Sequence, residues 1–300
     1  CQGYISYLRG ENPISFPVRL YPRHNPENII KAPGFTKDIF KNDIIVDKRL
    51  SFLELYSSKL QDKQLKIYKN EIDKYEGLEK LKIDNETVLL QISNIVYPNT
   101  EDDIDLIYGN NGLLNCMNET TKHNSIQYSY KKETIDNFGE FFHKDIIGNY
   151  SAKIKSILEI INNSEGIVFI YSNWIKSGVI PLILALEQNG FTKYDGKKIL
   201  NTKNKIDLVS YEGKYISEYR DKNDFIPGKY MVITGSTTGL TNHLEQELKI
   251  VTGDENKDGK QIKVIIGSTV ASEGLDFKNI RSIHVLEPWH NINKIEQVIG

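Results

Sequence analysis

Cysteine is scarce in this sequence. Cys1 and Cys116 are the only 2 among 300 residues, and they lie far apart in the chain. A fold held together by disulfides needs more cysteines at closer spacing, so their scarcity indicates a reducing, intracellular compartment. Histidine is also sparse. None of the 6 histidines has the spacing of metal ligands, and we therefore expect no metal site.

The sequence also lacks a long apolar run and an excess of charge. Its longest apolar stretch, around residues 179–186, contains a proline, whereas a membrane-spanning helix needs about 18 apolar residues. We find no signal peptide and expect no membrane partner. The formal net charge is −2, from 38 Lys+Arg against 40 Asp+Glu. This balance leaves nucleic-acid binding open, because a local basic groove is sufficient for it.

A P-loop is missing as well. The pattern G-x-x-x-x-G-K-[ST] wraps the phosphates of a nucleotide and holds Mg²⁺. The segments that end in Gly196-Lys197 and Gly259-Lys260 have the wrong glycine spacing, and neither continues with Ser or Thr. An Asp-Glu-x-Asp/His box is also absent. Residues 1–300 therefore lack the main binding site for a nucleoside triphosphate.

One segment imitates a calcium loop. Asp254-x-Asn256-x-Asp258-Gly259 has the first ligands of an EF-hand, but its twelfth position is Ile265. The bidentate glutamate that completes such a loop is thus absent. A polar turn before a strand is the better interpretation.

The first half of the chain is difficult to assign. Residues 1–41 are rich in Pro, Gly and Asn and predict an irregular connector with short strands. Apolar residues at three- and four-residue steps predict a helix within 49–75, and a shorter one is expected at Val88–Ile95. Within 99–150 we assign no element, and a further helix is expected near 150–162.

After residue 163, short apolar strands alternate with helices. This order predicts an α/β fold with a parallel sheet that is covered on both faces, and we place a domain boundary near residue 150. The expected strands are Ile167–Tyr171, Tyr230–Thr234, Ile262–Ile266 and Ser282–Leu286; the expected helices are Gly178–Gln188, Leu240–Ile250 and one that begins near Asn291; an inserted hairpin is expected at Lys205–Ser217.

The chemistry is concentrated after the third of these strands. G-S-T-V-A-S-E-G-L-D-F, Gly267 to Phe277, places backbone N–H groups and hydroxyls at the carboxyl end of a strand. Such groups suit phosphate oxygens and read no bases. Asp276 follows a turn at Gly274 and could accept hydrogen bonds from a ribose. An ordinary strand-to-loop connection is an equally good interpretation of this segment alone.

The segments that follow make the pattern specific. Gly267–Phe277, Glu287-Pro288-Trp289 and Gln297-x-x-Gly300 together resemble motifs V and VI of superfamily 2 helicases. Gly166–Trp174 and Met231–Ser236 resemble two further strands of the same lobe. The motif residues are similar to those of a branch of superfamily 2 helicases from large DNA viruses, which includes the poxviral early transcription factor ATPase and nucleoside triphosphatase I. The resemblance covers residues 165–300 well, 1–98 loosely and 99–150 not at all.

This resemblance implies a RecA-like parallel sheet flanked by helices over 151–300, preceded by an α-rich interlobe region over 1–150. It implies a nucleotide contact and a nucleic-acid contact. The expected nucleotide-binding residues are Gly274, Asp276, Gln297 and Gly300; the expected nucleic-acid-binding residues are Ser172, Asn173, Thr234, Gly235, Ser236, Ser268 and Thr269. Glu273 stands where many RNA helicases have arginine, so contacts of that branch are not transferred.

The function that the resemblance implies is an ATP-dependent helicase or translocase connected with viral transcription. ATP and Mg²⁺ would be the cofactors, bound mainly by a first lobe. DNA is favoured over RNA as the polymer, viral RNA polymerase or transcription factors are expected partners, and the host cytoplasm or the virion is the expected location.

We expect residues 1–300 by themselves to be inactive. The family's motif VI continues with an arginine after the glycine at Gly300, and an arginine finger contributes about 10³–10⁵-fold in rate. A non-catalytic α/β interaction domain of a transcription or packaging complex is the alternative. A sugar-nucleotide transferase is a weaker one, since it leaves the Gln297-x-x-Gly300 spacing unexplained.

Overall fold

The computed structural model divides the chain into two compact units, which are considered separately. The first contains the antiparallel pair β1 (Ile29–Lys31) and β2 (Glu54–Tyr56). All other elements belong to the second. The structure describes residues 29–31, 54–75, 83–100, 104–122, 125–235, 238–241, 244–269, 277, 279–287 and 298.

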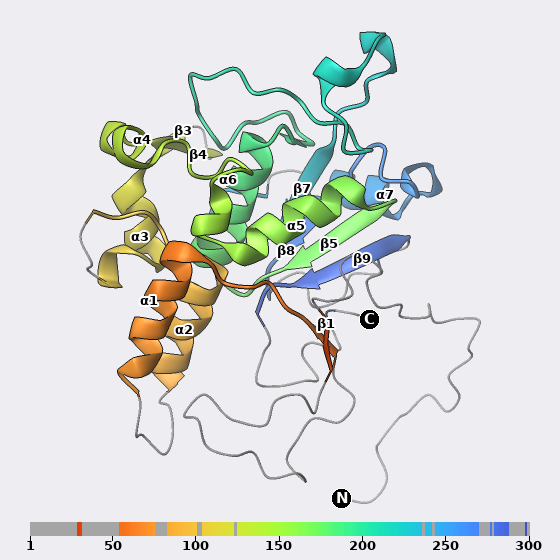
Figure 1. Cartoon of the computed structure of the whole chain (residues 1–300). Helices are drawn as coiled ribbons and strands as arrows, with labels where there is room; N and C mark the ends of the chain where they lie inside the picture. The colour runs from red at the N-terminus through yellow and green to blue at the C-terminus, as the bar shows by residue number, and fades with distance from the viewer. Residues whose placement is uncertain are drawn as a thin grey trace, which may run out of the picture. The chain divides into compact units, whose positions relative to one another are not determined.

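The second unit is built on a five-stranded sheet in which every pair of neighbours is parallel (Figure 1). The strand order is β6-β7-β8-β5-β9. The strands are β5 (Ile167–Tyr171), β6 (Thr192–Lys193), β7 (Lys229–Ile233), β8 (Val264–Gly267) and β9 (Ile280–Val285). Central strands with continuous Val and Ile residues are buried on both faces, as parallel sheets require.

Helices cover both faces of this sheet. Val168 and Ile170 of β5 belong to the same buried cluster as residues of α5 (Ala152–Asn163) and α6 (Ile180–Gln188). The alternate residues of β5, such as Phe169, pack in a second cluster with α7 (Leu244–Thr252). Figure 1 shows α5 lying across the strands. The predicted RecA-like sheet with flanking helices is confirmed.

Within the second unit, the elements before residue 150 share the larger of these two cores. Ile92, Tyr97 and Phe141 belong to the same buried cluster as Val168. The predicted boundary near residue 150 remains a prediction. The elements are α1 (Asp62–Asp73), α2 (Ile83–Asn94), α3 (Gly109–Cys116), β3 (Met117–Lys122), β4 (Ser125–Tyr130) and α4 (Lys132–Phe138), with short 3-10 turns at Ile104–Leu106 and Ile147–Asn149.

Most predicted elements after residue 150 are confirmed within a few residues. The hairpin expected at Lys205–Ser217 is reduced to one antiparallel bridge between Val209 and Tyr215. The helix expected within 49–75 begins only at Asp62, because Glu54–Tyr56 is a strand. The helix expected from Asn291 lies outside the described residues. No described helix has the length and apolar character that crossing a membrane requires.

Glu187 joins α6 to its neighbours. Its buried carboxylate accepts hydrogen bonds from the backbone N–H groups of Ile199 (3.0 Å) and Leu200 (2.6 Å) and from the Tyr230 hydroxyl on β7 (2.6 Å). Burial raises the pKa of this carboxyl. The helix, residues 199–200 and the sheet are thereby held to one another.

Candidate nucleic-acid interface

Three neighbouring strands end side by side at the carboxyl edge of the sheet. The Ser172 N–H donates to the Gly267 carbonyl (3.1 Å), and the Ser268 N–H donates to the Ile233 carbonyl (3.0 Å). These two bonds extend the ladder one residue beyond β5, β8 and β7. The polar residues that follow the strands therefore come from distant parts of the sequence to one edge, where ligands of parallel α/β sheets collect.

The predicted nucleic-acid-binding residues differ in exposure. The Ser172, Thr234 and Ser268 residues are 1, 3 and 4% exposed, respectively, and so lie below the surface. Asn173 and Gly235 are partly buried, and Thr269 is exposed. Ser236 lies outside the described residues, as do all four predicted nucleotide-binding residues: Gly274, Asp276, Gln297 and Gly300.

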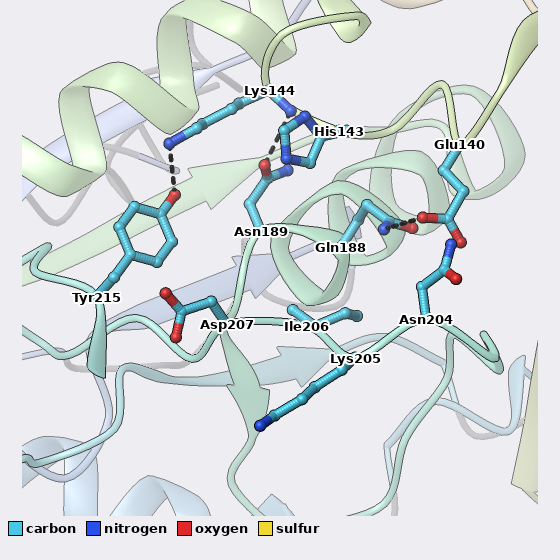
Figure 2. Close-up of a pocket in the computed structure, with 10 residues that line it drawn as sticks. All are labelled: Glu140, His143, Lys144, Gln188, Asn189, Asn204, Lys205, Ile206, Asp207 and Tyr215. Atoms are coloured by element: carbon cyan, nitrogen blue, oxygen red, sulfur yellow. Dashed lines mark hydrogen bonds between the residues drawn. The ribbon is translucent and has the colours of Figure 1, made fainter. Parts of the chain in front are cut away.

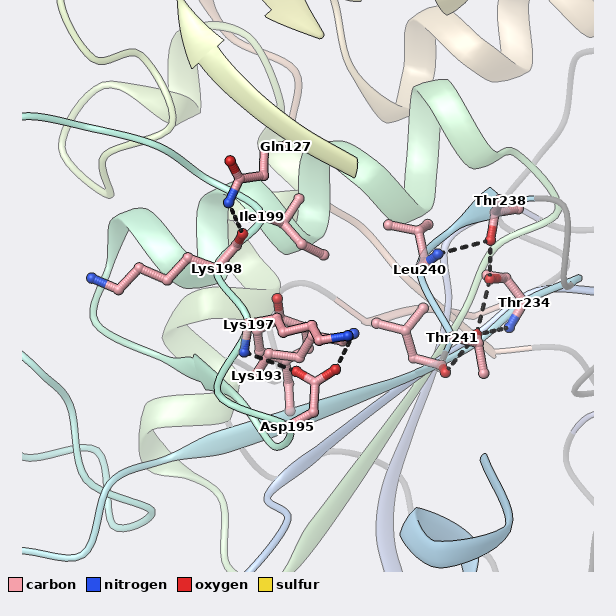
Figure 3. Close-up of polar contacts among 12 residues, drawn as sticks. Gln127, Lys193, Asp195, Lys197, Lys198, Ile199, Thr234, Thr238, Leu240 and Thr241 are labelled. Atoms are coloured by element: carbon pink, nitrogen blue, oxygen red, sulfur yellow. Dashed lines mark hydrogen bonds and ion pairs between the residues drawn. The ribbon is translucent and has the colours of Figure 1, made fainter. Parts of the chain in front are cut away.

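Threonine hydroxyls shape the turn after β7 (Figure 3). Thr234 Oγ1 lies 2.7 Å from Thr238 Oγ1 and 3.2 Å from Thr241 Oγ1. Thr241 Oγ1 accepts from the Thr234 N–H (3.1 Å) and donates to the Val232 carbonyl (3.0 Å). The Thr234 hydroxyl thus supports the loop, and the partly buried Gly235 stands nearer the surface.

Glu287 lies beneath the end of β5. One of its carboxylate oxygens accepts from the Ser172 hydroxyl (2.9 Å) and from the Asn173 N–H. The other accepts from Asn94 Nδ2 of α2 (2.8 Å). Burial raises the pKa of Glu287. From the sequence, Glu287 was identified only as part of the Glu287-Pro288-Trp289 motif, and this role was not predicted. A buried carboxylate directly after an apolar strand requires several hydrogen-bond partners, and that requirement was the available signal.

Lys153 of α5 completes the surroundings of this carboxylate. Its Nζ donates to the Leu286 carbonyl (2.6 Å), Asn94 Oδ1 (2.8 Å) and Ser93 Oγ (2.9 Å). Burial lowers the pKa of Lys153 to about 8, and the charge of Glu287 opposes that shift. A network of hydrogen bonds therefore joins α2, α5, β9 and the end of β5.

Residues 151–300 match the family model of the helicase conserved C-terminal domain. The chain belongs to that family. It is 25% identical to the putative ATP-dependent RNA helicase L377 of Acanthamoeba polyphaga mimivirus over all of this chain and 27% of that protein. It is 27% identical to an African swine fever virus early transcription factor large subunit homolog, over 51% of this chain and 14% of that protein.

A third relative is the African swine fever virus termination factor NPH-I homolog, 28% identical over 50% of this chain and 22% of that protein. The predicted likeness to superfamily 2 helicases of large DNA viruses is confirmed. The chain spans about a quarter of the length of the mimivirus relative L377 and less of the two swine fever virus proteins.

In this helicase domain, the segment after β5 begins with two donors that have no acceptor among the described residues. They are the buried Asn173 Nδ2 and Trp174 Nε1. Asn173 is oriented, because its Oδ1 accepts from the Tyr171 hydroxyl (2.8 Å). Buried donors normally have acceptors, so a ligand that carries acceptor oxygens would suit this position.

A single π-helical turn, Ile175–Val179, follows these donors. Such turns often occur at functional sites. A Cβ at Gly178 would lie 1.9 Å from the Ser172 hydroxyl, so only glycine permits this approach. The Ser177 hydroxyl is fixed by Gln91 Oε1 and the Gly109 N–H, each at 2.9 Å. The carboxyl edge of the helicase domain is therefore supported from below by residues 83–116.

The helicase domain also has a polar hollow of about 420 Å³ away from this edge (Figure 2). Its lining side chains bond largely to one another: the Lys144 N–H donates to Asn189 Oδ1 (2.8 Å), and Gln188 Nε2 donates to Glu140 (3.0 Å). Lys144 Nζ also donates to the Tyr215 hydroxyl (3.0 Å). These bonds join residues 140–144 to the end of α6 and to Tyr215. No group of three or more His, Cys, Asp or Glu side chains in the described ranges is arranged to hold a metal ion.

Proposed function

We propose that this chain acts as the second RecA-like lobe of an ATP-dependent superfamily 2 motor that moves on nucleic acid. One observation carries the proposal. In a domain of the helicase family, β5, β8 and β7 end side by side in Ser172-Asn173, Ser268-Thr269 and Thr234-Gly235. Hydroxyl and amide side chains in such a row can bind successive phosphates without reading sequence.

Gly235 and Thr269 would meet the phosphate backbone as the more exposed members of the row, and Asn173 would add a donor, its Nδ2, which is buried and has no acceptor among the described residues. Ser172, Thr234 and Ser268 would support them from below. This division of roles refines the sequence prediction, which assigned direct contacts to all of them.

ATP would bind between this lobe and a first lobe. In our proposal Asp276 contacts the ribose, and Gln297 and Gly300 line the cleft on this side. The phosphates and Mg²⁺ would be held by a P-loop, which residues 1–300 do not contain. We therefore expect the chain to hydrolyse ATP only together with a first lobe. Closure of the lobes on ATP, and their opening after hydrolysis, would move the bound strand.

The polymer and partners are also part of the proposal. We favour DNA as the polymer. We propose that the protein acts inside the cell, in the host cytoplasm or the virion, and that it contacts viral RNA polymerase or transcription factors. The likeness to an early transcription factor subunit homolog and a termination factor homolog supports this choice. Two mimivirus relatives are named as RNA helicases, so RNA belongs in every experiment.

Asn173→Ala is expected to weaken polynucleotide binding by about tenfold. The substitution removes a donor that would bond a charged phosphate oxygen, a contact worth on the order of 1.5 kcal/mol. Fluorescence anisotropy with labelled single-stranded DNA and RNA oligonucleotides measures the change. Asn223→Ala is the matched control, because Asn223 is exposed and lies on the 201–228 segment. Equal affinities of wild type and Asn173→Ala would place the bound strand elsewhere.

A further inference from the structure

Glu287 lies beside one of the two sites that the proposed function requires, the nucleic-acid-binding row. Its side chain reaches the end of β5, where it accepts the backbone N–H of Asn173. In the sequence, Glu287 directly precedes the segment that leads to Gln297, a predicted nucleotide-cleft residue. The Glu287 residue is 1% exposed and therefore does not meet a bound polymer directly.

The carboxylate of Glu287 fixes the position of Asn173 in two ways. It accepts the backbone N–H of Asn173 directly. It also accepts the Ser172 hydroxyl with both oxygens, at 2.9 and 3.2 Å. That hydroxyl is confined from the opposite side by the Cα of Gly178, since even a methyl group there would overlap it. The Trp174 carbonyl is a second acceptor for the Ser172 hydroxyl (3.3 Å), so Glu287 supplies the shorter bond to that hydroxyl and the bond to the Asn173 N–H.

The other side of the carboxylate is tied to the helices. Asn94 donates its Nδ2 to Glu287 and accepts Lys153 Nζ on its Oδ1, each at 2.8 Å. Asn94 is thus a bridge between an anion and a cation. The positive charge of Lys153, on the other side of Asn94, offsets part of the free-energy cost of burying the carboxylate.

We propose that Glu287 is a positioning residue for nucleic-acid binding, which holds the Ser172–Trp174 segment in its binding conformation and anchors it through Asn94 and Lys153 to α2 and α5. The proposal rests on the proposed function, because it takes Asn173 as a contact to the polymer. It assigns Glu287 no contact with the polymer itself.

The test is the affinity of the chain for a fluorescent single-stranded oligonucleotide, measured well below the unfolding temperature. Glu287→Gln replaces one carboxylate oxygen with an N–H₂ donor, which then faces groups that donate to Glu287 in the wild type. We expect the dissociation constant of the oligonucleotide to rise by about tenfold. Glu159→Gln, an exposed change on α5, is the control and should leave it unchanged.

A compensating double substitution separates positioning from general loss of structure. Glu287→Gln combined with Asn94→Asp transfers the carboxylate from position 287 to position 94 and the amide from position 94 to position 287. Asp at 94 can accept from Lys153 Nζ and from the new amide, while the glutamine oxygen still accepts from Ser172 and Asn173. We expect this pair to recover most of the lost affinity. Asn94→Ala, which removes one donor to Glu287, should weaken binding by about threefold and serves if Glu287→Gln does not fold.

The outcomes distinguish this inference from the function on which it rests. If the wild type binds and folded Glu287→Gln and Asn94→Ala bind equally well, Glu287 has no positioning role. If Glu287→Gln binds weakly and the double substitution gives no recovery, the proposed hydrogen-bond geometry is wrong. If the wild type binds neither DNA nor RNA, the proposed function itself fails.

Discussion

Glu187→Ala is expected to lower the free energy of unfolding by about 3–5 kcal/mol. The change leaves the N–H groups of Ile199 and Leu200 and the hydroxyl of Tyr230 without their acceptor in a buried site. Each unsatisfied donor costs about 1–3 kcal/mol. Chemical denaturation followed by circular dichroism measures the loss, at a pH and temperature where the wild type is fully folded.

Glu159→Ala is the matched control for this loss. Glu159 is an exposed glutamate on the neighbouring helix α5, and a surface substitution usually changes stability by less than about 0.5 kcal/mol. Glu187→Gln keeps one acceptor oxygen and should fall between the two. Similar stabilities for Glu187→Ala and Glu159→Ala would show that the carboxylate does not hold α6, residues 199–200 and β7 together.

Glu247 should make stability depend on pH in a way that a single substitution removes. Burial raises the pKa of Glu247 from 4.5 to about 7, with Asp195 adding to the shift and Lys193 opposing it. Between these values the folded protein keeps a proton that the unfolded chain releases. The folded state is therefore destabilised progressively as the pH rises from 4.5 to 7, and we expect the total effect to be about 2–3 kcal/mol.

Glu247→Gln removes this titration and keeps the size of the side chain. We expect the variant to be more stable than the wild type at pH 8 by about 2–3 kcal/mol, and the advantage to shrink toward pH 5. Because groups distant from Glu247 titrate equally in both proteins, the difference between the two curves reports on Glu247 and its charged neighbours Asp195 and Lys193. Glu245→Gln, an exposed change on the same helix, is the control. A constant difference between pH 5 and pH 8 would contradict the raised pKa.

The strands β5, β7 and β8 could be predicted from the sequence because each is a short run of mostly apolar residues, whereas β6, Thr192–Lys193, is too short and polar to be recognised. Ile167–Tyr171 was predicted with the boundaries that the structure has. The hairpin β3–β4 was missed, since only one of its faces is apolar. Ile126, Tyr128 and Tyr130 alternate with Ser125, Gln127 and Ser129, and this two-residue period was the available signal.

The candidate site could be predicted only in part. The polar residues after each strand were identified, because motif spacing follows the chain. Their burial was not, since it depends on partners brought together by the fold. Ser172 meets Glu287 across 115 positions and Asn94 meets it across 193. No local pattern marks Asn94 or Lys153 as supports of that edge.

We propose that this chain is one lobe of a motor driven by ATP on nucleic acid. The most direct measurement is the steady-state rate of ATP hydrolysis by a protein that contains this chain together with a P-loop lobe. It is made without polymer and with single- and double-stranded DNA and RNA. We predict that at least one polymer stimulates the rate and that Asp276→Ala abolishes the stimulation. If the protein is folded and none of these polymers changes its rate of ATP hydrolysis, the proposed motor function is wrong. The alternative, a non-catalytic interaction domain, would then be the better interpretation.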